Sequence, residues 1–366
     1  MKKTLSRLIA VSHYSSGITF GLPLGSNLPW HLVFALSRPS SFFSIGWCFS
    51  YVLVASSLSL FIFGEFELAL VSKYFLVVLS AFIPFWYSNS VIREVPSISR
   101  IVFWFLIFFG FMQTLGFPGF VSGLFELAIP KFRGEPWGQG VSYRGVSLIW
   151  SEPAQASFYL LMAFVLGFWN SKKKSFALLS LALSQLFLVK SVTGIFLVFL
   201  LTLLIYPISI KRSIGVLILL LGVASVAILT NPKLSGTYDR FSTSNPESAI
   251  KYLSDRSGGR LATPLYSAYR SLGNYGIPLL DTSTLEPMLF NHQTFGLVNN
   301  VGYFSSNHGL VGGWVFLFFL IFLLQRFRLQ FHGRILLLLT VLSFVYSPAW
   351  TPFLVLAARV SFLNEE

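Results

Sequence analysis

Residues 154–190 decide the fold of this chain: AQASFYLLMAFVLGFWNSKKKSFALLSLALSQLFLVK. Two apolar runs, 154–170 and 174–190, meet at three consecutive lysines at positions 172–174. Each run approaches the roughly 20 residues that a helix needs to cross the hydrocarbon core of a bilayer. Lys and Arg accumulate in the cytoplasmic loops of membrane proteins. The stretch therefore predicts a helical hairpin in a membrane, with its turn in the cytoplasm.

The composition of the whole chain also indicates a membrane protein. Of its 366 residues, 54% are hydrophobic and only 11% are charged, whereas soluble domains have roughly 25% charged residues. The net charge of +13 would suggest nucleic-acid binding in a soluble protein, but basic cytoplasmic loops explain it better here. We expect an all-α polytopic membrane protein that binds no nucleic acid. Its one cysteine, Cys48, cannot form an intramolecular disulfide.

Apolar runs elsewhere predict further membrane-spanning helices. The clear candidates are 42–63, 67–88, 100–120, 154–170, 174–190, 193–209, 213–230 and 307–325. Residues 8–37 and 335–363 are interrupted by glycine or proline, so each could form one bent segment or two short ones. The start, MKKTLSRLIAV, is expected to be retained, because no small-residue cleavage site follows it.

The basic residues help to choose between these alternatives. If the strongest basic clusters are cytoplasmic, residues 8–37 must form a hairpin of two short segments, near 8–23 and 27–37. Residues 335–363 are split in two by analogy. The chain then forms a single membrane domain, 1–366, with about 12 segments and both termini in the cytoplasm. The basic residues assigned to the cytoplasmic side are Lys2, Lys3, Arg7, Arg38, Arg93, Arg100, Lys172, Lys173, Lys174, Lys211, Arg212, Arg326, Arg328 and Arg334.

This threading leaves two large loops on the outer side, 121–153 and 231–306. Loops this long are usually either functional or disordered, and the aromatic and glycine content of the second loop favours an ordered structure. The first loop contains Arg144 and ends at Glu152, which directly precedes Pro153 and a predicted helix. Glu152 could contribute to a site together with Arg144, or it could simply cap the positive end of that helix.

The second outer loop carries the arginines Arg256, Arg260 and Arg270. The guanidinium group stays charged and donates paired hydrogen bonds, which suits it to phosphate groups. Arginines converging from both loops would therefore form a pyrophosphate clamp. The alternative is that they form ordinary surface ion pairs with Asp239, Glu247 or Asp255.

Two histidines in or after the second loop, His292 and His308, are candidates for a general base, because histidine can accept a proton near neutral pH. Either could instead make only local hydrogen bonds. His13 is expected at a membrane interface, and Lys190 and Arg359 are expected to extend their charged ends toward water from the ends of their segments. Motifs for nucleotide binding, zinc proteases, serine hydrolases and metal-bound nucleotide sugars are absent from the sequence.

Four groups of residues resemble the Wzy-type O-antigen polymerases of the O-antigen ligase-like superfamily. They are Arg144–Gly145 with Ser151–Glu152–Pro153; Ser257–Gly258–Gly259–Arg260–Leu261; Tyr275–Gly276; and Asn307–His308–Gly309–Leu310–Val311–Gly312–Gly313. The expected profile of twelve segments is also similar. The alternating Arg-x-Gly spacings described for such loops are not clearly present here.

The resemblance implies a polymerase in the bacterial cytoplasmic (inner) membrane that makes surface polysaccharide such as lipopolysaccharide O-antigen or capsule. Its substrates would be oligosaccharides linked to undecaprenyl pyrophosphate, and a chain-length regulator is an expected partner. The transfer would be inverting, without metal or cofactor. Arg144, Arg256, Arg260 and Arg270 would bind the pyrophosphate. The base would be His308, His292 or Glu152, and Trp150 and Tyr266 would stack on sugars.

Two other functions are compatible with the same sequence. An O-antigen ligase would use the same donor but transfer the glycan to lipid A-core. A polysaccharide flippase or other transporter is a different class, which often has internal repeats and charges deep in the helical bundle. The sequence shows no internal repeat, and its charges outside the cytoplasm are concentrated in two loops. These features disfavour transport.

Overall fold

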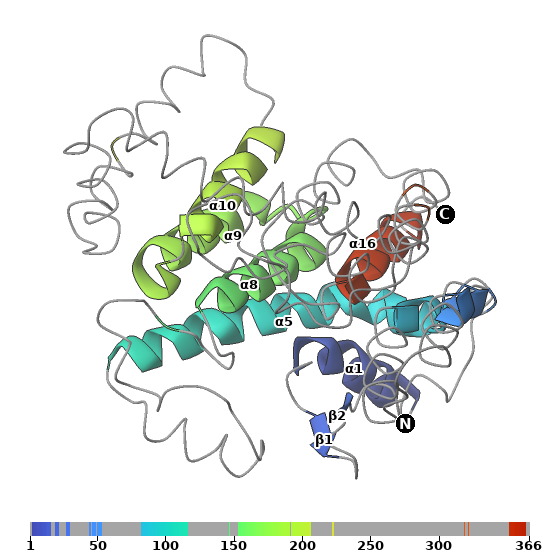
Figure 1. Cartoon of the computed structure of the whole chain (residues 1–366). Helices are drawn as coiled ribbons and strands as arrows, with labels where there is room; N and C mark the ends of the chain where they lie inside the picture. Colours follow the sequence, from blue (N-terminus) through green and yellow to red (C-terminus); the bar gives the residue numbers. More distant parts are fainter. Residues whose placement is uncertain are drawn as a thin grey trace, which may run out of the picture. The chain divides into compact units, whose positions relative to one another are not determined.

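A computed structural model gives the fold of the chain (Figure 1). The chain divides into two compact units, which we call the terminal unit (Met1–Val95 with Lys251–Glu366) and the central unit (Pro96–Ile250). The residues that the structure describes are helical apart from one short strand pair. These residues are 2–15, 19–21, 27–29, 44, 46–48, 50–52, 82–115, 146, 153–190, 192–205, 222, 318, 321 and 351–363.

The terminal unit begins with a short helix, α1 (Lys2–Ser12), and one 3-10 turn, η1 (His13–Ser15). Two strands follow, β1 (Thr19–Gly21) and β2 (Asn27–Pro29), which pair antiparallel with Phe20 opposite Leu28. The prediction of two short helical segments at 8–23 and 27–37 is therefore wrong over both strands. Glycine and proline interrupt this stretch and disfavour a helix, so the chain makes a strand pair instead.

The predicted helix 67–88 does not continue to its expected end. Residues Ile83–Phe85 form a 3-10 turn, η3, with Pro84 inside it. The chain then bends through Trp86 and Tyr87 before α5 begins at Asn89. Proline lacks a backbone N–H, so it favours such a break. Residues 82–87 of this break, which spans residues 82–89, are buried, and α16 packs against η3.

Arg359 lies on the helix α16 (Thr351–Leu363) and is only 2% exposed. Its Nη1 donates to the carbonyl oxygens of Pro84, at 2.8 Å, and Tyr87, and its Nη2 donates to Asn89 Oδ1 at 2.9 Å. The expectation that Arg359 extends toward water is therefore wrong. Carbonyls at a chain break are not engaged by a regular helix, and the guanidinium satisfies them.

The longest described helix is α5 (Asn89–Thr114), with 26 residues. It begins well before the predicted segment 100–120, so Arg93 and Arg100 belong to the helix and not to a loop. Pro96 lies inside the helix without ending it. At 1.5 Å per residue α5 is about 39 Å long. It is the one helix among the described residues that is long and apolar enough to cross a membrane, judged by length and composition.

Three consecutive helices form most of the described central unit. They are α8 (Pro153–Phe168), α9 (Lys174–Leu183) and α10 (Val192–Ile205), and α9 continues directly into a π-helix, η4 (Ser184–Val189). Short connections make neighbouring helices antiparallel, and the three pack side by side (Figure 1). The segments predicted at 154–170 and 174–190 are confirmed to be helical. The helix predicted at 193–209 is confirmed as far as the structure describes it.

An aromatic cluster joins α5 to α8 in the central unit. The ring of Phe103 lies 6.2 Å from that of Phe164 and 5.2 Å from that of Phe168, measured between centroids. Gly167 allows the close approach, because a Cβ there would lie 2.9 Å from the backbone nitrogen of Arg100. Since α8 ends next to the lysine turn, Arg100 lies at the same end of the central unit as the three lysines.

Replacing Arg359 should destabilise the protein more than breaking an exposed ion pair. Arg359→Leu leaves the two buried carbonyls of Pro84 and Tyr87 without this donor, at a cost of about 1–3 kcal/mol for each unsatisfied group, partly offset because a charge is no longer buried. The matched change Arg7→Leu removes a partly exposed ion pair with Glu94 at 2.9 Å, which is worth roughly 0–1 kcal/mol. Thermal unfolding of the purified protein in detergent measures both. Equal melting temperatures for the two variants would contradict the role given to Arg359.

Candidate functional site

The candidate site residues named from the sequence all lie outside the described residues. They are His308, His292, Glu152, Arg144, Arg256, Arg260, Arg270, Trp150 and Tyr266. Within 121–153, the stretch predicted as the first outer loop, the structure describes Val146 and Pro153, which is the first residue of α8. The positions of these two residues are the structural information on the candidate site.

Val146 is hydrogen-bonded to the end of η4. Its backbone N–H donates to the carbonyl oxygen of Leu188 at 2.9 Å, and its side chain is buried. The last carbonyls of a helix have no partner within that helix, so the end of η4 offers an acceptor to a passing chain. Val146 lies two residues beyond Arg144 in the sequence.

The start of α8 lies at the same end of the central unit. Since α8 and the α9–η4 helix are antiparallel, the first turn of α8 faces η4, and Gln185 Nε2 donates to the carbonyl oxygen of Ser157 at 3.2 Å. Glu152 directly precedes Pro153, the first residue of α8. Both described anchor points of the first loop therefore lie at one end of the helices, opposite the turn that contains the three lysines.

An unusual backbone marks this end of the helices. The π-helix η4 stops at Lys190, which adopts a left-handed conformation with φ 51° and ψ 39°, and α10 begins at Val192. Lys190 is the one residue other than glycine with positive φ among those described. Such a conformation costs on the order of 1–3 kcal/mol and persists where the surroundings determine it. Single π-turns are frequent at functional sites. No pattern in the sequence indicated either feature.

The terminal unit contains a second polar cluster that the sequence did not predict. His13 Nε2 shares a hydrogen bond with the hydroxyl of Tyr87, and both side chains are buried. The main-chain oxygen of Tyr87 accepts from Arg359. His13 was expected at a membrane interface, and the structure shows that the residue is buried within the protein, at 1% exposure. The cluster ties the segment after α1, the break at residues 82–89 and α16 together.

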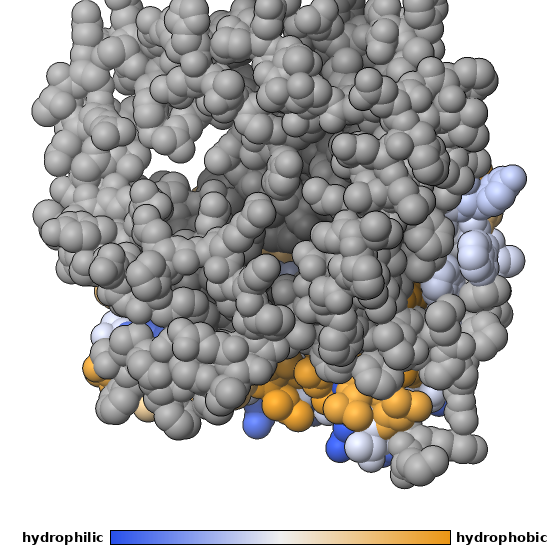
Figure 2. All heavy atoms as spheres, turned by 60° about the horizontal axis from the view of Figure 1, so that its bottom comes forward, coloured by the Kyte–Doolittle hydropathy of each residue, from blue (hydrophilic) through white to orange (hydrophobic). Residues whose placement is uncertain are grey.

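Exposed hydrophobic side chains follow one face of α5 and one face of the α9–η4 helix. We call these residues the apolar belt: Ile101, Trp104, Phe105, Phe108, Phe111 and Leu115 on α5, and Phe176, Leu179, Leu183 and Phe187 on α9–η4. Trp104 and Phe176 join the two rows, with ring centroids 5.6 Å apart. Figure 2 shows hydrophobic side chains of described residues reaching the surface next to hydrophilic ones.

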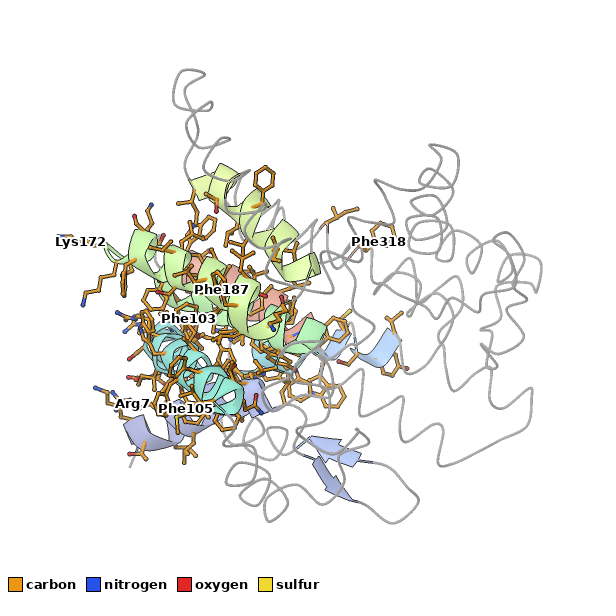
Figure 3. All side chains as sticks on the ribbon, turned by 90° about the vertical axis from the view of Figure 1, so that its left-hand side faces the viewer. Arg7, Phe103, Phe105, Lys172, Phe187 and Phe318 are labelled. Carbon is orange, nitrogen blue, oxygen red and sulfur yellow. The ribbon has the colours of Figure 1, made fainter. Side chains whose placement is uncertain are left out.

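Basic residues lie at one end of the apolar belt. Arg100 is exposed on α5 near its contact with Gly167. Lys172 and Lys173 are exposed in the turn between α8 and α9, and the side chain of Lys172 extends away from the helices (Figure 3). Contiguous exposed apolar surface is uncommon on soluble monomers and marks contact with another apolar phase or partner. This arrangement suits acyl chains along the belt and anionic headgroups at the basic end.

Within the described part of the chain, no group of His, Cys, Asp and Glu side chains is placed to hold a metal ion. Comparisons of the chain with protein-family models, with curated proteins and with solved structures find no match. The functional proposal therefore rests on the residues, the resemblance they carry and the geometry around the first loop.

The docking of Val146 on η4 can be tested by a designed disulfide. In a Cys48→Ser background, which leaves no native cysteine, we expect Val146→Cys with Leu188→Cys to cross-link on mild oxidation. Disulfides need Cα atoms roughly 4.4–6.8 Å apart, and residues joined by a backbone hydrogen bond lie near this separation. A protease site inserted in the lysine turn would let a non-reducing gel show whether the two fragments stay joined.

The matched control pairs Val146→Cys with Leu179→Cys, an exposed position on the same helix about 13 Å further along its axis. This pair should not cross-link under the same conditions. If Val146→Cys and Leu188→Cys stay reduced, or if both pairs react equally, the first loop is not anchored at the end of η4.

Proposed function

We propose that the protein is a multi-pass glycosyltransferase of the bacterial inner membrane, with about twelve segments and two large outer loops. It joins oligosaccharide repeat units carried on undecaprenyl pyrophosphate into a surface polysaccharide. The proposal rests on the residues that resemble the Wzy-type polymerases, in particular Arg144, Glu152, Arg260 and His308. Two features of the described residues support it, namely the apolar belt with its basic end and the positions of Val146 and Pro153.

The membrane location is supported by the apolar belt and by its basic end. The belt exposes phenylalanine and leucine along two adjacent helices, a distribution that lipid tolerates and water does not. Arg100, Lys172 and Lys173 gather at one end, where cytoplasmic loops are expected to be basic. With that end in the cytoplasm, the end that holds Val146 and Pro153 is on the outer side. Lipid-linked repeat units are expected there.

The observation that carries the site is the anchoring of the first loop at both of its described points. Val146 bonds to Leu188 at the end of η4, and α8 starts at Pro153 at the same end of the unit. Arg144 lies two residues before the first point, and Glu152 one residue before the second. This supports a site to which Arg144 and Glu152 both contribute, next to the positive end of the α8 helix dipole.

The proposed reaction needs no metal or redox partner. A hydroxyl oxygen of the acceptor sugar forms a bond to the anomeric carbon of the donor glycan. The bond from that carbon to the pyrophosphate oxygen breaks, and the lipid pyrophosphate leaves with the electron pair. The hydroxyl proton passes to a base, His308, His292 or Glu152. Arg144, Arg256, Arg260 and Arg270 offset the charge that develops on the pyrophosphate, and Trp150 and Tyr266 stack on sugar rings.

The activity can be tested with the purified protein in liposomes that contain lipid-linked repeat units. We expect a ladder of longer glycans that remain attached to the lipid carrier. Glycan that appears only on added lipid A-core would instead identify a ligase. Movement of repeat units between leaflets without any elongation would identify a transporter. Deletion of the gene in its host should also shorten the surface polysaccharide, and a normal ladder in the deletion strain would exclude the polymerase.

Two single substitutions should abolish polymerisation without loss of the protein from the membrane. Arg260→Ala removes a proposed pyrophosphate ligand. It should lower the rate about 10²–10³-fold, because the charge that develops on the pyrophosphate in the transition state loses a hydrogen-bond donor. His308→Ala removes the first candidate base and should lower the rate about 10²–10⁴-fold. Arg240→Ala and His332→Ala are matched controls of the same residue types outside the proposed site. Activity close to wild type in Arg260→Ala or His308→Ala would remove that residue from the site.

A further inference from the structure

A buried amide connects η4 to α8 one helical turn inside the outer end of the central unit. Gln185 is fully buried, and its Nε2 donates to the main-chain oxygen of Ser157 at 3.2 Å. Among the described residues, none donates a hydrogen bond to Gln185 Oε1. A buried amide oxygen without such a donor is unfavourable by about 1–3 kcal/mol. Gln185 is thus a costly residue at a position where leucine or methionine would pack without that penalty.

Gly194 on α10 faces the same amide. A Cβ at Gly194 would collide with both Ser157 Oγ and Gln185 Oε1. The two oxygens therefore lie against the backbone of α10, within reach of weak Cα–H···O contacts. Small residues allow helices to approach this closely, especially in membranes. Gln185, Ser157 and Gly194 form one layer in which all three helices of the central unit meet, and we call it the amide layer.

The amide layer lies directly beneath the two anchor points of the first loop. Gln185 precedes Leu188, the acceptor for Val146, by three residues of η4, and Ser157 follows Pro153 by one turn of α8. One described point of the loop, Val146, is bonded to η4, and the other, Pro153, is the first residue of α8. The relative position of these two helices at the amide layer therefore sets the relative position of the two loop ends.

We propose that Gln185 is a positioning residue, whose bond to Ser157 sets the distance between the start of α8 and the end of η4, and so between Pro153 and Val146, the described residues that lie close in the sequence to Glu152 and Arg144. The role given to Glu152 and Arg144 rests on the proposed function. The part that concerns the distance between α8 and η4 does not. A hydrogen bond has a defined length and direction, which apolar packing lacks. That directionality accounts for an amide at a buried position where an apolar side chain would be less costly.

The geometric part is tested with the full-length protein in nanodiscs. Spin labels at Ala154→Cys and Lys190→Cys, in the Cys48→Ser background, report the distance between the start of α8 and the end of η4 by pulsed electron paramagnetic resonance. We expect a single narrow distribution, which broadens when Gln185→Met is added. Methionine fills a similar volume but cannot donate to Ser157. The control Ser180→Ala removes a hydroxyl that bonds to Phe176 O within its own helix at 3.0 Å, and it should leave the distribution narrow.

The functional part is tested by the initial rate of glycan elongation against donor concentration. We expect Gln185→Met to lower kcat between roughly tenfold and a hundredfold, as misalignment of reacting groups does, with a much smaller change in KM. Its melting temperature should stay close to that of Ser180→Ala. A purely structural role would lower the melting temperature and the amount of folded protein at unchanged kcat. Gln185→Asn, which keeps a shorter amide, serves as the second variant if Gln185→Met does not fold.

The two proposals fail in different ways. If wild-type protein makes no polymer but Gln185→Met still broadens the distance distribution, the proposed function is wrong and the geometric role of Gln185 stands. If wild-type protein polymerises and Gln185→Met retains both the narrow distribution and the wild-type kcat, Gln185 is not a positioning residue. A broadened distribution at unchanged kcat would also overturn the proposal, because the alignment would then not matter for the reaction.

Discussion

Main-chain carbonyls that a regular helix cannot satisfy are the constraint on which the described structure depends. Where a helix breaks or ends among apolar side chains, its free acceptors must find donors elsewhere, since an unsatisfied buried group is costly. In the terminal unit, the carbonyls of Pro84 and Tyr87 accept from Arg359. In the central unit, the carbonyl of Leu188 accepts from Val146. In both cases a distant segment supplies the missing donor, so the breaks become the points where the chain is tied together.

The central unit shows how far periodicity and charge predict such a structure. Long apolar runs separated by basic turns gave the helices α8, α9 and α10 close to their observed starts, because each helix buries the side chains that the pattern marks. The same reasoning placed the start of α5 too late. Arg93 and Arg100 were assigned to a cytoplasmic loop, but both lie exposed on the surface of α5, and Pro96 lies within this helix without ending it. Element type followed from the sequence better than element boundaries.

Polar residues inside the protein were the least predictable part. His13 was expected at a membrane interface and Arg359 was expected to extend toward water, and both are buried and hydrogen-bonded to residues of the segment 84–89. The partners are far apart in the sequence, and single-sequence patterns carry no information on such pairing. The π-helical conformation of η4 could not be predicted from the sequence either, because it depends on packing against other segments. The sequence predicted which residue types could form the candidate site. The hydrogen bonds of Val146 and Gln185, which hold the helices next to it, are tertiary contacts that the sequence does not reveal.

The bonds of Arg359 also constrain the order in which the protein is made. The terminal unit combines Met1–Val95 with Lys251–Glu366, and Arg359 is separated from Asn89 by 270 positions along the chain. During translation, the acceptors at residues 84–89 emerge long before their donor. At roughly 5–20 residues per second, the interval is on the order of tens of seconds. The central unit, whose partners are close in sequence, can assemble within that interval. The carbonyls of Pro84 and Tyr87 therefore lack this donor until α16 has been synthesised, whereas the partners within the central unit become available much earlier.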